Sequence, residues 1–274
     1  MAEANRFLIA IDDGHGQETS GKRTPVIPEL RRSIKENEFN RAVASLLDQE
    51  LRRLGFRTLL VAPTDVDTPL ANRTNLANSR KANIYVSIHY NAGGGRGIET
   101  YYYPGSSSGK KLAETVHRHI TKGTSQVNRG IKTADFYVLR ETSMPAILIE
   151  FGFMDDPGLI EARRMLDKAF QTECALETAQ GICEYFGVPY RTSPPNPVPP
   201  NAPKPSVPKY PGYLIKKGSI GSSVRLIQRQ LGGLVVDGIF GPKTEARVKA
   251  FQKQKKLAVD GIVGPITWRS LFGS

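Results

Sequence analysis

The chain has 274 residues, more than one small domain needs and typical of two. Apolar residues make up 39% and charged residues 23%, which excludes collagen-like and largely disordered chains, and no run approaches the ~20 apolar residues of a membrane helix. The 38 basic and 26 acidic residues leave a net charge of +12, which suggests nucleic acid, a membrane surface or an anionic polymer as partner.

We expect no export signal in the N-terminal region. The apolar run 7–11 is too short for the core of a signal peptide and follows an acidic residue. Strand and helix patterns then alternate through the first 188 residues. Strands are predicted over 6–12, 57–62, 83–90, 97–104, 135–139 and 146–150, and helices over 36–54, 70–81, 109–122 and most of the stretch up to 186. This alternation predicts an α/β domain with a mainly parallel sheet flanked by helices.

The cysteines Cys174 and Cys183 belong to the last of these helical stretches. Their spacing places them on opposite faces of a helix and about 13 Å apart along its axis. A disulfide needs Cα atoms within about 7 Å, so we expect two free, buried thiols. Free thiols are typical of synthesis in a reducing host cytoplasm.

Prolines gather between Pro189 and Pro211, where they make up ten of 23 residues. Such a segment joins neither helix nor sheet and predicts an extended spacer, the alternative being a motif for a proline-binding domain. The predicted organisation is therefore a catalytic domain over 1–188, a linker over 189–211 and a second domain over 212–274. The first domain has 24 basic and 23 acidic residues, whereas the last has eleven and three, a net charge of +8.

The last domain contains an internal repeat, because D-G-x-x-G-P-x-T occurs at 237–244 and again at 260–267. In each copy Asp-Gly predicts a tight turn, and Gly-Pro precedes a helical pattern. Helices are predicted over 223–231, 243–254 and 266–272, which makes this a small all-α module. The two units resemble the helical peptidoglycan-binding module of many cell-wall hydrolases, which implies bacterial peptidoglycan as a partner.

Two histidines and a carboxylate are predicted at one edge of the sheet. His15 stands between two glycines after the first strand, His89 lies near the end of the third, and Glu150 ends the last. Histidine and carboxylate ligands with one open position are usual at catalytic zinc sites, where a further carboxylate can act as general base. The ordinary alternatives are histidines that only hydrogen-bond a neighbour and a glutamate that is paired with an arginine.

A further carboxylate is sought between His15 and the first long helix, where four glutamates occur at 18, 29, 36 and 38. Helical periodicity aligns Glu36 with Val43 and Leu47 on the face that packs on the sheet, whereas Glu38 lies about 200° away. A buried cation would justify a charge in that direction. A favourable interaction with the helix dipole alone would explain the position of Glu36 but not its inward direction.

The motifs D-x-G-H-G at 12–16, K-E-N-E-F-N at 35–40, S-I-H-Y-N-A at 87–92 and I-E-F-G-F at 149–153 follow one another in this order. Together they resemble the zinc-dependent N-acetylmuramoyl-L-alanine amidase family of the amidase-3 type, over nearly all of residues 5–187. The resemblance implies Zn²⁺ as cofactor, with His15, Glu36 and His89 as its ligands and Glu150 as the catalytic carboxylate.

Two further positions are interpreted through this resemblance. Asn91 matches the family's S-x-H-x-N motif and is expected to help shape the substrate site. Asp13 stands where the family usually has proline. This departure is expected to change the turn or to add an acceptor for His15, without removing a ligand.

Three functions remain to be compared. The first is an amidase that cleaves the bond between N-acetylmuramic acid and L-alanine, aided by a basic module that concentrates it on anionic wall polymers. The second is a zinc peptidase that cuts within the stem peptide. The third is a non-catalytic protein that binds nucleic acid, which we do not expect because the basic domain shows no nucleic-acid motif. We expect a phage or prophage endolysin without membrane insertion, made in the host cytoplasm and acting on the wall after release, with a sporulation enzyme as the alternative.

Overall fold

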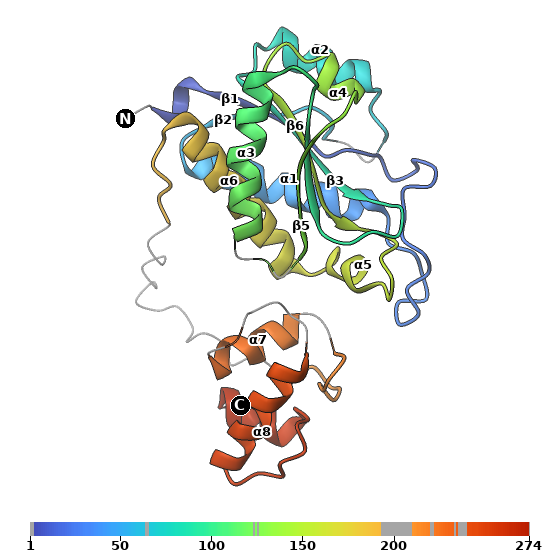
Figure 1. Ribbon diagram of the computed structural model, residues 1–274, viewed down its shortest axis with the longest axis vertical. Helices are drawn as coiled ribbons and strands as arrows, with labels where there is room; N and C mark the ends of the chain where they lie inside the picture. Colours follow the sequence, from blue (N-terminus) through green and yellow to red (C-terminus); the bar gives the residue numbers. More distant parts are fainter. Residues whose placement is uncertain are drawn as a thin grey trace. The chain divides into compact units, whose positions relative to one another are not determined.

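The computed structural model divides the chain into two compact units, residues 1–191 and 192–274. It describes residues 3–63, 66–122, 124, 126–192, 210–219, 222–232, 234 and 240–273 (Figure 1). Most of the expected linker over 189–211 lies outside the described residues. The boundaries 1–188, 189–211 and 212–274 therefore stay a prediction, and each unit is described by itself.

The first unit contains a six-stranded sheet in the order β2-β1-β3-β6-β4-β5. All neighbouring strands are parallel except β4 and β6, which are antiparallel, so the expected mainly parallel sheet is confirmed. The strands are β1 (Leu8–Asp12), β2 (Arg57–Leu60), β3 (Ile84–Asn91), β4 (Ile98–Tyr102), β5 (Asn128–Thr133) and β6 (Ala146–Phe153). Strands β1, β3 and β6 are central and nearly continuous in apolar residues because both faces of the sheet are covered.

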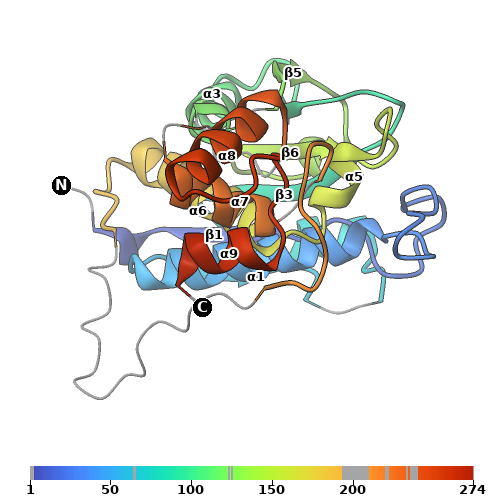
Figure 2. The same ribbon diagram turned by 90° about the horizontal axis from the view of Figure 1, so that it is seen from below.

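Helices cover both faces of this sheet. One face packs on α1 (Glu36–Arg53), α3 (Ser107–Lys122) and α6 (Lys168–Phe186) through the larger apolar core, and Figure 2 shows α1 in blue along the strands. The other face packs on α2 (Leu70–Ser79) and α4 (Tyr137–Arg140), which lie side by side in Figure 1. The short elements η1 (Ala4–Arg6) and α5 (Ile160–Arg164) complete the unit. None of the described helices is long and apolar enough to span a membrane.

One predicted element is wrong, and one strand was not predicted. Residues 135–139, expected as a strand, contain the start of α4, and the strand of this region is β5 at Asn128–Thr133. A short apolar run such as Phe136–Leu139 does not distinguish a buried strand from one turn of helix. The cysteines, in contrast, are both buried and free on α6, as their spacing predicted.

The C-terminal unit is helical, as predicted, with α7 (Ser222–Leu231), α8 (Pro242–Gln254) and α9 (Pro265–Phe272) around a core that includes Trp268. The repeat has a structural meaning here. Gln228 donates to the Thr244 hydroxyl at 3.1 Å, and its counterpart Gln252 donates to Thr267 at 3.3 Å. Each threonine of the repeat thus joins its helix to the preceding one. The Asp-Gly turn of the first copy lies outside the described residues.

Candidate metal and catalytic site

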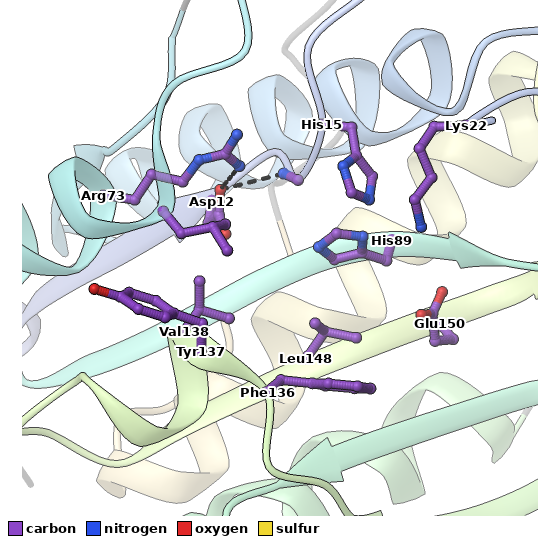
Figure 3. Close-up of a pocket in the computed structure, with 12 residues that line it drawn as sticks. Asp12, His15, Lys22, Arg73, His89, Phe136, Tyr137, Val138, Leu148 and Glu150 are labelled. Atoms are coloured by element: carbon purple, nitrogen blue, oxygen red, sulfur yellow. Dashed lines mark hydrogen bonds and ion pairs between the residues drawn. The ribbon is translucent and has the colours of Figure 1, made fainter. Parts of the chain in front are cut away.

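The three central strands carry the candidate residues to one edge of the sheet. Because β1, β3 and β6 are adjacent and parallel, their carboxyl ends meet there. In the register, His89 of β3 lies directly opposite Glu150 of β6. Figure 3 shows His15, which follows β1, above His89, with Glu150 on the neighbouring strand. The sheet therefore brings together residues that are 135 positions apart in the chain.

The turn that carries His15 depends on Gly14. This residue has a φ of +66°, a backbone conformation that glycine adopts readily and that residues with a Cβ rarely adopt. A Cβ there would lie 2.8 Å from Cε1 of His89 and 2.9 Å from the carbonyl oxygen of Ile88. Only glycine therefore lets the turn pass so close to His89. The centroids of the His15 and His89 imidazole rings lie 5.0 Å apart.

Glu36 begins α1, and its side chain points inward, as helical periodicity predicted, with 1% of its surface exposed. Its Oε1 accepts from the amide nitrogens of Asn40 and Tyr90 at 3.1 and 3.0 Å and lies 3.0 Å from Nδ1 of His89. Its Oε2 is buried and accepts no hydrogen bond from the described residues, and Nε2 of His15 lies 3.7 Å from it. A carboxylate oxygen without a partner is costly to bury, which favours a cation at this point.

His15, Glu36 and His89 together form a set of possible metal ligands. One ligand atom from each lies within 4.8 Å of the other two. Burial lowers the pKa of His15 to about 4, so its ring is neutral at physiological pH and free to coordinate. Burial alone would raise the pKa of Glu36, but the hydrogen bond and charge of His89 outweigh it and lower that pKa to about 2. Two imidazoles and an ionised carboxylate are the donor set that zinc prefers, and the residues present therefore fit this ion.

Glu150 lies beside these three residues with different surroundings. Its Oε2 is buried and finds no hydrogen-bond partner among the described residues. Burial, more than any neighbouring charge, raises the pKa of Glu150 to about 8. The alternative of a salt bridge to an arginine is not seen within the described part of the chain. A carboxyl group with its pKa near neutrality can accept and return a proton, as a general base and acid must.

A cavity of about 230 Å³ opens over these residues (Figure 3). His15, His89 and Glu150 line it together with Lys22, whose ammonium group lies 4.0 Å from Oε2 of Glu36. The other wall is apolar and aromatic and comes from segments distant in sequence: Leu70, Phe136, Tyr137, Val138 and Leu148. Neither Lys22 nor this wall is predicted from the sequence. The order of the strands alone does not show which loops close over the strand ends.

Asn91 and Asp13 lie outside this cavity. The Asn91 amide donates to Glu99 at 3.1 Å, and its carbonyl accepts from the amide of Ala92, so it shapes the loop after β3. Asp13 is buried and lines a separate hollow with Arg41, and burial raises its pKa to about 7. Among the described residues, no hydrogen bond joins the Asp13 carboxyl group to His15. The expected roles of both residues stay predictions.

Three possible metal ligands with a further, partly buried carboxylate beside them, in a cavity at the strand ends, form an arrangement that suits a hydrolase active site. Residues 9–184 match the family described as N-acetylmuramoyl-L-alanine amidase, and residues 220–271 match a putative peptidoglycan binding domain. The chain therefore belongs to the N-acetylmuramoyl-L-alanine amidase family and joins an amidase domain to a peptidoglycan-binding domain. Its function is cell-wall hydrolysis, which favours the first of the three functions compared above.

Individual relatives agree with this assignment. The chain is 36% identical over 181 residues to the N-acetylmuramoyl-L-alanine amidase CwlM of Bacillus licheniformis, covering 66% of this chain and 69% of that protein. It is 36% identical over 185 residues to an endolysin of Bacillus phage SPP1, covering 65% of each. The solved catalytic domain of CwlV, an amidase from Bacillus (Paenibacillus) polymyxa, matches with a TM-score of 0.59 and 34% identity, over 67% of this chain and 99% of that one.

Proposed function

We propose that this amidase depends on zinc held by His15, Glu36 and His89. The observation that carries the proposal is the buried Oε2 of Glu36, which lacks a hydrogen-bond partner among the described residues and faces His15. The close approach of the three ligand atoms supports it. A zinc ion held there supplies Lewis acidity, which polarises the scissile amide carbonyl and makes a water molecule a better nucleophile.

Glu150 is proposed to move the proton in this reaction. In its ionised form, which a cation held beside it would favour, the carboxylate takes a proton from the attacking water and returns it to the amide nitrogen as the bond to L-alanine breaks. Its place opposite His89 supports this role, because adjacent strands fix the two side chains over the same cavity. The apolar wall with Phe136 and Leu148 limits the water around the reacting groups, which strengthens electrostatic interactions there.

Replacing Glu150 with glutamine tests this role. We expect Glu150→Gln to bind zinc as the wild type does while kcat falls by about 10²- to 10⁴-fold. Glu114→Gln is the matched control, because Glu114 is exposed on α3, pairs with Lys110 and does not line the cavity. Full activity of Glu150→Gln would refute the assignment. Mass spectrometry of digested peptidoglycan should show intact stem peptides that begin with free L-alanine, whereas new amines elsewhere would favour a peptidase.

We further propose that the C-terminal module, over residues 212–274, places the catalytic domain on the wall and that residues 189–211 tether the two. The net charge of +8 on the module supports attraction to anionic wall polymers or peptide carboxylates as well as to peptidoglycan. The identity to the SPP1 endolysin supports a lytic role of the same kind. That role is tested by comparing two experiments. In the first, the protein is added to whole cells from outside; in the second, it is expressed inside cells together with a membrane-permeabilising protein, and lysis is measured in both.

A further inference from the structure

A buried chain of hydrogen bonds lies behind His89, away from the proposed metal position. Ser87 precedes His89 by two residues on β3, so both side chains project from the same face of the strand. The parallel register places Asp12 of β1 directly opposite Ser87. The Ser87 hydroxyl lies 2.7 Å from Oδ2 of Asp12 and 3.1 Å from Nε2 of His89. Arg73 of α2 donates to Oδ1 of Asp12 at 2.8 Å, so four side chains form one continuous chain.

The chemistry at the two ends of this chain decides where each proton sits. The Arg73 guanidinium only donates and the carboxylate paired with it only accepts, so the single hydroxyl hydrogen of Ser87 goes to Asp12. The Ser87 oxygen is then left to accept, and Nε2 of His89 must carry the hydrogen that it receives. Nδ1 is on the side of Glu36, whose Oε1 lies 3.0 Å away. In the metal-free protein Nδ1 donates to that oxygen, and a bound cation would take the place of this hydrogen while Nε2–H stays on Ser87.

We infer that Ser87, supported by Asp12 and Arg73, is a positioning residue that fixes His89 in the Nε2–H tautomer, so that Nδ1 is the atom that coordinates the metal. This inference rests on the proposed zinc site. A hydrogen bond to the nitrogen that does not coordinate sets the tautomer and orientation of a metal-ligating histidine.

The side chains of this hydrogen-bonded series are buried, which holds them in one position. Ser87 is fully buried, and Asp12 and Arg73 are each 1% exposed. Removing such a charge pair from water is expensive, and it is retained only where its geometry is well satisfied. Asp12 also accepts from the amide of Gly14 at 3.2 Å, at the start of the turn that carries His15. A single carboxylate thus supports the orientation of both candidate histidine ligands.

The alternative is that Asp12 and Arg73 only anchor α2 to the sheet. Ser87→Ala separates the two possibilities, because it removes the link to His89 and leaves the Asp12–Arg73 pair in place. In the full-length protein we expect Ser87→Ala to weaken zinc binding about 10- to 100-fold in competition with a chelating dye. Asp12→Asn, which removes the charge but keeps the size, should also weaken it.

Thr100→Val is the matched control. Thr100 has a buried hydroxyl in the same sheet, 2.9 Å from Nδ1 of a histidine, His117, and no hydrogen bond among the described residues links its side chain to the candidate metal ligands. Its zinc affinity should equal that of the wild type. Equal zinc affinity of Ser87→Ala and wild type, or an equal loss in Thr100→Val, would overturn the inference.

Nitrogen-15 NMR of the zinc-loaded wild type gives a second measurement that does not depend on activity. We expect the His89 ring hydrogen on Nε2 and the metal on Nδ1, and the reverse assignment would overturn the inference. Zinc stoichiometry and the released product of the wild type report on the proposed function. A zinc-binding amidase in which Ser87→Ala changes neither affinity nor tautomer would refute this inference alone.

Discussion

Gly14 offers a test of how closely the His15 turn and the His89 ring are packed. Gly14→Ala puts a methyl group at a φ of +66°, which costs about 1–2 kcal/mol for an L-residue. The new Cβ would also lie 2.6 Å from Nδ2 of Asn40, 2.8 Å from the His89 ring and 2.9 Å from the Ile88 carbonyl. The carbonyl belongs to a central strand and cannot move away, so overpacking adds about 1–3 kcal/mol.

Gly21→Ala is the control that separates the two costs. Gly21 also has a positive φ, +74°, but a Cβ there meets nothing within 4 Å. Gly21→Ala should lower the free energy of unfolding by the backbone term alone, whereas Gly14→Ala should lower it by about 2–5 kcal/mol in total. In a unit of this size, 1 kcal/mol lowers the Tm by about 2–4 °C.

Calorimetry with zinc and with a chelator is the assay. Gly14→Ala should unfold at a lower temperature than Gly21→Ala and should also bind zinc more weakly, because the displaced His89 ring turns from the donor set. Equal unfolding temperatures and equal zinc affinities in the two variants would show that the turn adapts. The close-packing explanation of Gly14 would then be wrong.

Two further outcomes are expected. Glu99 is 1% exposed and accepts hydrogen bonds from Lys132, Tyr101 and Arg129. Burial alone would raise its pKa, but these bonds outweigh burial and lower the pKa to about 2. The ionised carboxylate therefore stabilises the fold fully above about pH 4.5, and this stabilisation is lost as the pH falls toward 2. Glu99→Gln should therefore lower the free energy of unfolding by about 1–3 kcal/mol at pH 6 and by much less near pH 3, measured by urea titration, and a difference independent of pH would contradict this. Deleting residues 189–274 should weaken binding and lysis of whole cells, most strongly at low salt, while hydrolysis of soluble wall fragments persists; unchanged lysis would remove the targeting role of the module.

The position of the net charge follows from the sequence and bears on this last outcome. The sequence assigns +8 to the module and a near-neutral balance to the catalytic domain. Attraction to an anionic wall can then be weakened by salt without change at the active site. The charge that first suggested a general polyanion partner thus belongs to the domain that matches the peptidoglycan-binding family.

Local patterns in the sequence were sufficient for much of the candidate site. His15, His89 and Glu150 each follow an apolar strand, and parallel strands bring such positions to one edge whatever their exact order. Helical periodicity predicts that Glu36 points inward, because the apolar face of α1 packs on the sheet and Glu36 lies on that face. Only neighbours in sequence are needed for this. The structure places His15, His89 and Glu150 around one cavity and Glu36 beside the two histidines, and their roles stay proposals.

Contacts between segments that are distant in the sequence could not be predicted from local patterns. The antiparallel pairing of β4 with β6, the place of β5, and the approach of Lys22 and Phe136 to the cavity depend on strand order and on how loops pack. The chain from Arg73 through Asp12 and Ser87 to His89 depends on a register that a shift of one residue would destroy. The sequence by itself thus determined which residues are candidates for the chemistry and which region carries most of the positive charge. Only the tertiary structure decided how the candidate ligands are oriented, because their orientation comes from hydrogen bonds between strands and a helix that are far apart in the chain.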